Sequence, residues 1–380
     1  MSNAILLAPG PVQLHPEVQK ILAQPMIHHR TPEFDQILKN VLTQLRFFFQ
    51  TSQPVFMHTS TGSGAMESAL VNVLSPGDEV LAIVSGKFGE RWADMAEVYG
   101  AKVLRHNVPW GHAVNCAEIE ALLNEHKNIK HVLCQACETS TATAHDIKKL
   151  GELVQKTPAL FIVDGITAVG AYELPMDLWH IDVLVAGSQK AVMLPTGLSL
   201  ISLSQKAWAV AEKARTPRFY FDLRRELKAN QNGETLFSAP VPLVKALNYV
   251  LGRIEEIGLE KHFSQLRRRA QCTREVARLM GLTLYSRSPS DSVTALNVPA
   301  GFDGVKLREH LEKKYLLTIM GGQDEAKGKI LRIGHMGYIT DQHLIETMHR
   351  LALALVDFGL KIDTDDIKRK ITIWLEANRI

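Results

Sequence analysis

The amino-acid sequence predicts an α/β fold, with a mostly parallel central sheet in a large domain and a small α+β domain at the C-terminal end. Between residues 55 and 202, short apolar runs alternate with helical patterns, which is the order of a parallel sheet covered by helices. Two of the runs, Leu160–Asp164 and the one that begins at Val183, are apolar and rich in β-branched residues. Such runs are typical of strands that are buried on both faces.

Ahead of this alternation, the segment 8–11 is too rich in proline and glycine for a helix. A short helical pattern follows His15, and Thr31 before Pro32 predicts the start of an amphipathic helix. The large domain is then expected to contain strands at 55–58, 79–84, 102–104, 131–134, 160–164, from 183 and at 198–202, and helices at 65–74, 89–99, 116–124 and 147–155.

After residue 202 the pattern changes. Two long helices are expected at 241–258 and 259–280, followed by strands at 293–296, 316–320 and 330–333 and helices at 304–314, 342–358 and 364–377. We therefore expect a large domain over residues 1–270, which includes the N-terminal segment, and a small domain over residues 271–380.

The composition is that of an ordinary globular protein: 46% of the 380 residues are hydrophobic, 22% are charged, and the net charge is +3. The two signs of charge are interspersed, which argues against nucleic acid or a membrane surface as a partner. For the basic run at 267–269, a solvated helix face is favoured over a nucleic-acid contact. No apolar run is long enough to span a bilayer, and the N-terminal residues lack the basic start of a signal peptide, so a cytoplasmic location is expected.

The four cysteines do not predict a metal site. Cys134 and Cys137 have the spacing of a redox or metal pair, but no second pair completes a zinc site. They are better interpreted as reduced thiols at the end of a strand, and no metal is expected.

Each of the two buried runs places an ionisable group beyond a strand: Asp164 ends the first, and Lys190 follows the second. In such a sheet, ligands bind in the crevice outside the carboxyl ends of the strands. Pyridoxal phosphate needs a lysine for its Schiff base and a carboxylate that keeps its pyridinium nitrogen protonated, so it is the cofactor that this pair predicts. Lys190 would also move the proton at the substrate Cα. Alone, either residue has an ordinary explanation, as a surface lysine or as a strand-end cap.

An anion site is predicted where the run at 55–58 leads into a helix. The segment Gly62-Ser63-Gly64 offers small residues at a helix start, where backbone N–H groups and the helix dipole favour phosphate. The spacing misses the dinucleotide fingerprint, and no lysine follows as in a P-loop. With these two kinds of site excluded, a site for a single phosphate group fits the small residues at the helix start.

Further motifs stand in a definite order along the chain: Gly62-Ser-Gly-Ala-Met-Glu67, Lys87-Phe88-Gly89, Glu138-Thr-Ser-Thr141, Val163-Asp164, Gly187-Ser-Gln-Lys190 and Leu331-Arg-Ile-Gly334. Together they resemble the class V aminotransferases of fold type I, which depend on pyridoxal phosphate. The nearest branch is that of alanine–glyoxylate and serine–pyruvate aminotransferases, some bacterial members of which are labelled small subunit of soluble hydrogenase. The resemblance extends from residue 8 to about residue 358.

The resemblance implies a role for each matching residue. Lys190 matches the Schiff-base lysine, and Asp164 the partner of the pyridinium nitrogen. The other positions are implied as follows: Gly62, Ser63, Gly64 and Gln189 at the phosphate, Thr139 beside the phenolic oxygen, Phe88 stacked on the ring, Arg332 on the substrate carboxylate, and Gly10 close to the substrate Cα. A loop at about Thr235–Ser238 matches one that reaches the phosphate of a second subunit, which implies a homodimer with shared active sites and adds Ser238 to the cofactor contacts.

Four departures from the family pattern bear on substrate preference and on the tightness of cofactor binding. Ala142 replaces a common glycine, Thr196 replaces a common proline, Thr235 replaces an aromatic residue, and Phe88 stands where the animal enzymes have tryptophan. We expect an aminotransferase that moves the amino group of alanine or serine to glyoxylate or pyruvate in two half-reactions at one site. One alternative is a lyase, desulfurase or epimerase of the same superfamily, although Gln189 stands where desulfurases usually have histidine. Another is a non-catalytic subunit of a complex. The sequence does not distinguish the donor, the acceptor or the pathway.

Overall fold

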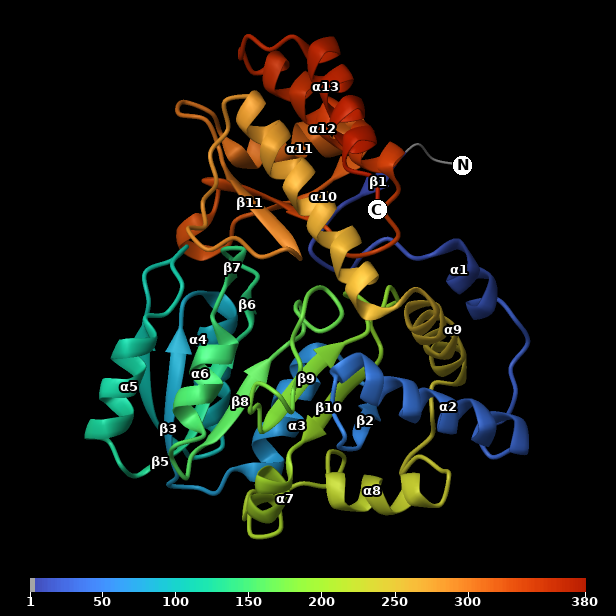
Figure 1. Ribbon diagram of the computed structural model, residues 1–380, viewed down its shortest axis with the longest axis vertical. Helices are drawn as coiled ribbons and strands as arrows, with labels where there is room; N and C mark the ends of the chain where they lie inside the picture. Colours follow the sequence, from blue (N-terminus) through green and yellow to red (C-terminus); the bar gives the residue numbers. More distant parts are fainter. Residues whose placement is uncertain (1–3) are drawn as a thin grey trace.

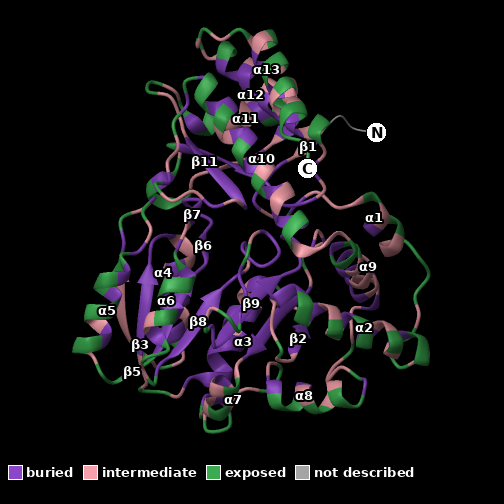
Figure 2. Ribbon diagram, viewed as in Figure 1, coloured by how far each residue is buried: buried purple, intermediate pink, exposed green. Residues whose placement is uncertain are grey.

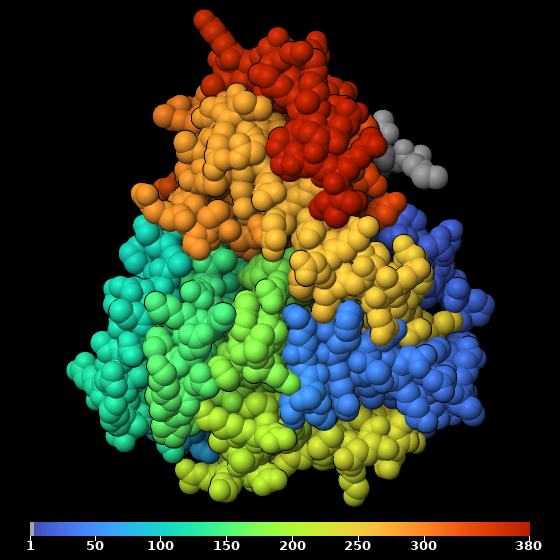
Figure 3. Space-filling view, viewed as in Figure 1, coloured from blue at the N-terminus to red at the C-terminus, as the bar shows by residue number. Residues whose placement is uncertain are grey.

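The computed structural model describes residues 4–380 and consists of two parts, a larger one below and a smaller one above, the latter built mainly from the end of the chain (Figure 1, Figure 3). The larger part contains a seven-stranded sheet. In spatial order its strands are β2 (Val55–His58), β10 (Ser199–Leu203), β9 (Val183–Gly187), β8 (Leu160–Asp164), β5 (Ile129–Gln135), β3 (Glu79–Val84) and β4 (Lys102–Asn107). Only β10 runs antiparallel to its neighbours in this sheet. The predicted α/β fold with a mostly parallel sheet is confirmed.

The central strands are buried on both faces (Figure 2). Along β8, Leu160 and Ile162 pack in one apolar cluster, and Phe161 and Val163 pack in another on the opposite face. The first cluster includes residues of α3 (Gly62–Val73), α4 (Lys87–Val98), α7 (Gln205–Ala211) and α8 (Leu223–Gln231), and the second includes residues of α1 (Pro16–Leu22), α2 (Pro32–Phe49), α5 (Cys116–Glu125), α6 (Ile147–Val154) and α9 (Val241–Ile257). Alternate side chains of a strand point to opposite faces, so a continuous apolar run fills both layers.

The smaller part has its own apolar cluster, to which Ile5 and Leu7 contribute from the start of the chain. Its strands are β11 (Val293–Asn297), β14 (Ile330–Gly334) and β13 (Met320–Gly321) in one sheet, and β1 (Ile5–Leu6) with β12 (Leu317–Thr318) in another. Its helices are α10 (Leu259–Leu279), α11 (Gly304–Tyr315), α12 (Asp341–Asp357) and α13 (Thr364–Ala377), with a short 3₁₀ turn at Asp324–Ala326. The strand predicted at 316–320 is wrong as a single element, because Leu316 adopts a left-handed conformation and residues 317–318 and 320–321 pair in different sheets.

Two helix starts differ from the prediction in a way that matters for the site. Helix α3 begins at Gly62 rather than 65, and α4 begins at Lys87 rather than 89. The segment Gly62–Gly64 is therefore the first turn of α3, and Phe88 lies in the first turn of α4. Two short strands, β6 (Cys137–Glu138) and β7 (Thr143–Ala144), were not predicted.

The basic run at 267–269 is not a solvated helix face. Arg268 forms an ion pair with Asp341, and Arg269 donates to the carbonyls of His335 and Gly337, so two of the three arginines tie α10 to the rest of the smaller part. Cys134 and Cys137 are free thiols and are buried.

The predicted domain limit at residue 270 falls inside α10 and stays a prediction, as does the cytoplasmic location. None of the helices within residues 4–380 is both long and apolar enough to cross a membrane. Residues 1–3, part of the stretch used for the prediction on a signal peptide, lie outside the described residues.

Candidate active site

A hollow with a volume of about 80 Å³ opens beyond the carboxyl ends of β8 and β9, beside the first turns of α3 and α4. In Figure 1 these strands point toward the junction of the two parts of the molecule. The hollow is lined by Gly62, Ser63, Met66, Phe88, Arg91, Thr139, Asp164, Ile166, Thr167, Gln189 and Lys190. Most of the residues that the sequence predicts for a cofactor site are thus brought together from five distant stretches of the chain.

Asp164 and Lys190 are both buried in this hollow. Asp164 Oδ1 accepts a hydrogen bond of 2.8 Å from the Ile166 N–H, and burial raises the pKa of this carboxyl to about 7. Lys190 Nζ donates to the Pro9 carbonyl at 2.8 Å, and burial lowers the pKa of this amine to about 8. An amine with a pKa near neutrality is suited to nucleophilic attack and to proton transfer.

The residues at the phosphate end leave hydrogen-bonding groups for a ligand. Thr61, which precedes α3, makes no capping hydrogen bond through its side chain, so the N–H groups of the first turn are left for another acceptor. The Gln189 Oε1 is buried without a partner among the described residues. The open N–H groups of the helix start fit a bound phosphate, whereas the Gln189 Oε1 is an acceptor and needs a donor.

Phe88 and Thr139 are held in place by their neighbours. The N–H groups of Phe88 and Gly89 donate to the Glu138 carboxylate at 3.1 and 3.0 Å, which fixes the start of α4 and with it the Phe88 side chain. Burial raises the pKa of Glu138, and hydrogen bonds from Ser140 and these backbone groups only partly counteract this rise. Thr139 Oγ1 lies 2.8 Å from Thr167 Oγ1.

Arg332, on β14, reaches the rim of the hollow from the smaller part. It donates to the Thr139 carbonyl and to the Gly321 carbonyl, both at 2.9 Å. Burial lowers the pKa of Arg332 to about 10, so the guanidinium is still a cation at neutral pH. No carboxylate of residues 4–380 lies within 4 Å of it, so the alternative of a structural salt bridge does not account for this buried charge.

Gly10 lies directly against Lys190. Its φ is 138°, and a Cβ at this position would collide with the lysine side chain. Glycine is favoured here by the backbone conformation, and a Cβ would also force the end of the Lys190 side chain to move.

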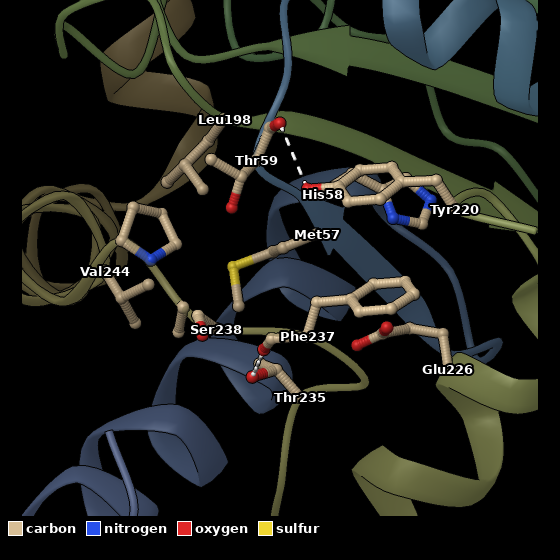
Figure 4. A pocket seen from close by; sticks show the side chains of 12 residues that line it. Met57, His58, Thr59, Leu198, Tyr220, Glu226, Thr235, Phe237, Ser238 and Val244 are labelled. Carbon is tan, nitrogen blue, oxygen red and sulfur yellow. Dashed lines mark hydrogen bonds between the residues drawn. The ribbon is translucent and has the colours of Figure 1, made fainter. Parts of the chain in front are cut away.

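Four predicted residues do not line this hollow. Gly10 and Arg332 lie next to residues that do, Lys190 and Thr139, whereas Gly64 and Ser238 lie elsewhere. Gly64 faces Ser60 and Phe221 on the other side of the α3 start. Ser238 lines a separate hollow with Thr59, Tyr220 and Phe237, where the Tyr220 and Phe237 rings are stacked 4.9 Å apart (Figure 4). The loop at 235–238 therefore does not reach Lys190 within one chain.

The sequence prediction missed Arg91, Thr167, Ile166 and Met66 as lining residues. Arg91 had a signal that could have found it, because it lies three positions after Phe88 on a helix, on the same face. Residues 4–380 contain no group of three or more His, Cys, Asp or Glu side chains placed to hold a metal ion.

The model of the class-V aminotransferase family matches residues 13–342 of this sequence. The chain belongs to this family. It is 36% identical over 362 residues to the small subunit of soluble hydrogenase from Synechococcus sp. (strain PCC 6716), with 94% of each chain covered. It is also 36% identical over 365 residues to L-aspartate–glyoxylate aminotransferase from Paracoccus denitrificans, with 94% of this chain and 92% of the relative covered.

Among solved structures, the fold of this class-V aminotransferase is similar to that of ureidoglycine–glyoxylate aminotransferase from Bacillus subtilis, with a TM-score of 0.91, 27% identity and 98% of each chain covered. The chain is accordingly an aminotransferase, its fold is that of the fold type I enzymes, and its cofactor is pyridoxal phosphate. Bound at such a site, this cofactor holds the substrate nitrogen and accepts electrons from the substrate Cα. The alternative of a non-catalytic subunit is thereby set aside, whatever label a relative carries.

Proposed function

We propose that this aminotransferase moves the amino group of a small amino acid, alanine or serine, to glyoxylate or pyruvate by a ping-pong mechanism. The acceptor is supported by two of the similar proteins, which carry glyoxylate in their names. The observation that carries the proposal is the position of Lys190. Its buried amine lies between the Asp164 carboxylate, the start of α3 and Gly10, in the only arrangement of this kind that we find within residues 4–380.

In this proposal the residues of the site divide the work. Lys190 would hold the cofactor covalently and would move the proton to and from the substrate Cα. Asp164 would hold the proton on the ring nitrogen, and Phe88 would contact the ring. Gly62, Ser63 and Gln189 would bind the phosphate, Thr139 would donate to the phenolic oxygen, and Arg332 would bind the substrate carboxylate by two parallel hydrogen bonds. For Gly64 we propose a contribution through its backbone N–H alone.

The close approach of Gly10 to Lys190 supports a small donor. The chain at Pro9 and Gly10 occupies the space beside the amine, because Pro9 accepts its hydrogen bond and a Cβ on Gly10 would collide with it. A substrate whose Cα lies next to Lys190 therefore has little room for a long side chain.

We further propose a homodimer in which the loop at 235–238 completes the partner's site. Within one chain, Ser238 lines the hollow shown in Figure 4, whereas Lys190 lines the other one. Phe219 beside this loop is 70% exposed, although it packs on Phe237. The loop does not reach the Lys190 site of its own chain, and the aromatic group beside it is exposed. Both features are consistent with an interface between two chains.

A transfer assay tests the substrates. Alanine, serine, aspartate and glutamate are offered as donors, each with glyoxylate and with pyruvate, and the new amino acid is quantified. We expect alanine or serine with glyoxylate to give the highest kcat/KM, and double-reciprocal plots to give parallel lines. Preference for aspartate, the donor in the name of the Paracoccus relative, would contradict the proposed donor. Consumption of the donor without a new amino acid would favour the lyase, desulfurase or epimerase.

A further inference from the structure

Arg91 is a cation in the active-site hollow to which the family resemblance gives no role. It lies on α4, one turn after Phe88, and lines the hollow together with Asp164 and Lys190. Its Nη1 donates to Ser63 Oγ at 3.1 Å, and its guanidinium carbon lies 4.9 Å from the centre of the Phe88 ring. The side chain therefore connects the ring that is to stack on the cofactor with the helix start that is to bind phosphate.

Within residues 4–380 the Arg91 guanidinium forms no close ion pair, although its charge acts on the Asp164 carboxyl from farther away. None of the carboxylates in residues 4–380 forms an ion pair with it within 4 Å. A half-buried guanidinium normally makes charge-assisted hydrogen bonds to a carboxylate or phosphate, and it loses part of its hydration without them. The serine hydroxyl supplies one acceptor for a group that carries five donors.

A second, independent feature points to the same kind of ligand at the same place. Ser63, the acceptor for Arg91, lies in the first turn of α3, a helix of 12 residues whose start has no side-chain cap. The N–H groups of that turn and the helix dipole favour an anion. Gln189, whose side-chain NH₂ can donate to a phosphate oxygen, lines the same hollow.

We propose that Arg91 binds the phosphate group of the cofactor, on the side that faces the Phe88 ring, and so fixes both the phosphate and the ring. This inference rests on the cofactor site proposed above and adds a residue to it. The planar fork of a guanidinium matches two phosphate oxygens, whereas a lysine at this position would act only as a point charge. The competing explanation is that Arg91 serves only to pack against Phe88.

Binding of pyridoxal phosphate and of pyridoxal distinguishes the two explanations, because the two ligands differ only in the phosphate. Dissociation constants are measured by absorbance on cofactor-free protein for the wild type, Arg91→Met and Arg91→Lys. Arg105→Met is the matched control, since Arg105 also contacts α4, through Asp94 and Glu97, but does not line the hollow. We expect Arg91→Met to weaken binding of pyridoxal phosphate roughly 10- to 100-fold, with pyridoxal almost unchanged. Arg91→Lys should lose less affinity for pyridoxal phosphate, and Arg105→Met should bind both ligands as tightly as the wild type.

An equal loss for both ligands would overturn the inference in favour of packing on Phe88, and so would unchanged binding of pyridoxal phosphate. Should Arg91→Met not fold, Arg91→Lys decides the question by the same ratio of the two dissociation constants. Inorganic phosphate provides a further readout: it should compete with pyridoxal phosphate in the wild type and compete less well in the variants. A wild-type protein that takes up no cofactor on Lys190 would contradict the proposed site itself, which separates that failure from a failure of the Arg91 inference.

Discussion

At the scale of single residues, Asp164 and Lys190 are placed where burial disfavours their charged forms. Burial raises the pKa of Asp164 to about 7 and lowers the pKa of Lys190 to about 8. The place of both residues at the edge of the sheet could be predicted from the sequence, because Asp164 ends β8 and Lys190 lies three positions after β9. Arg91 could be found only by its helical spacing from Phe88, since its contact with Ser63 comes from another segment. The contacts of Glu138 with the N–H groups of Phe88 and Gly89 could not be predicted, because they join segments far apart in the sequence.

Replacing Asp164 by asparagine is expected to stabilise the cofactor-free protein while it removes the proposed charge beside the ring nitrogen. Folding raises the pKa of Asp164 from 3.8 to about 7, so the ionised group costs stability in full above about pH 7, and this cost vanishes as the pH falls to about 4. At pH 8 the variant should gain on the order of 1–3 kcal/mol in the free energy of unfolding, with almost no gain near pH 4.

Urea unfolding of both proteins at the two pH values measures this difference. Asp365→Asn is the control, because Asp365 is exposed in the first turn of α13, has no burial cost to relieve and should therefore gain no stability at pH 8. Equal stability of wild type and Asp164→Asn at pH 8 would contradict the burial cost assigned to this carboxyl.

At the scale of elements, the starts of α3 and α4 show the limit of local signals. A helix start is predicted from a capping side chain close by in the sequence, as Thr31 shows for α2, where its hydroxyl accepts from Phe34. The N–H groups at the start of α4 are instead held by Glu138, 50 positions away from Phe88, and α3 has no side-chain cap at all. Neither a distant acceptor nor a missing cap leaves a pattern in the local sequence, so the sequence predicts a start that is too late for both helices.

Glu138→Ala is therefore expected to destabilise the protein by roughly 1–3 kcal/mol, because it leaves the buried N–H groups of Phe88 and Gly89 without an acceptor. Glu138→Gln keeps one acceptor oxygen and should lose less stability than Glu138→Ala. Urea unfolding measures both variants, and an alanine variant as stable as the wild type would show that the carboxylate does not hold the start of α4.

The smaller part shows a second limit of the same kind. The apolar run at 316–320 reads as one strand, but Leu317 pairs with Ile5 at the opposite end of the chain, whereas Met320 pairs with Arg332. Partners so far apart in sequence are fixed by the tertiary fold rather than by the run itself. The same reason explains the basic run at 267–269, where the carbonyls and the carboxylate that bind Arg268 and Arg269 come from other elements.

At the scale of the whole molecule, the proposed dimer explains why the loop at 235–238 lies apart from Lys190 in its own chain. Phe219→Asp places a charge on the exposed aromatic group beside this loop. We expect this variant to be monomeric by light scattering and to bind pyridoxal phosphate more weakly, since each site would lack the partner's loop. Val98→Asp is the control, because Val98 is 81% exposed at the end of α4 and lines neither hollow. A wild-type protein that is monomeric at assay concentration would contradict the shared site.

The most direct test of the central claim follows the two half-reactions on the loaded enzyme by absorbance. The wild type with pyridoxal phosphate should show the visible band of the lysine-bound cofactor. This band should disappear when alanine or serine is added alone, with one equivalent of 2-oxo acid released, and it should return when glyoxylate is added. Lys190→Ala should show neither change. A band that persists while the donor is consumed, or a Lys190→Ala protein that behaves like the wild type, would contradict the assignment of Lys190 as the residue that carries amino transfer.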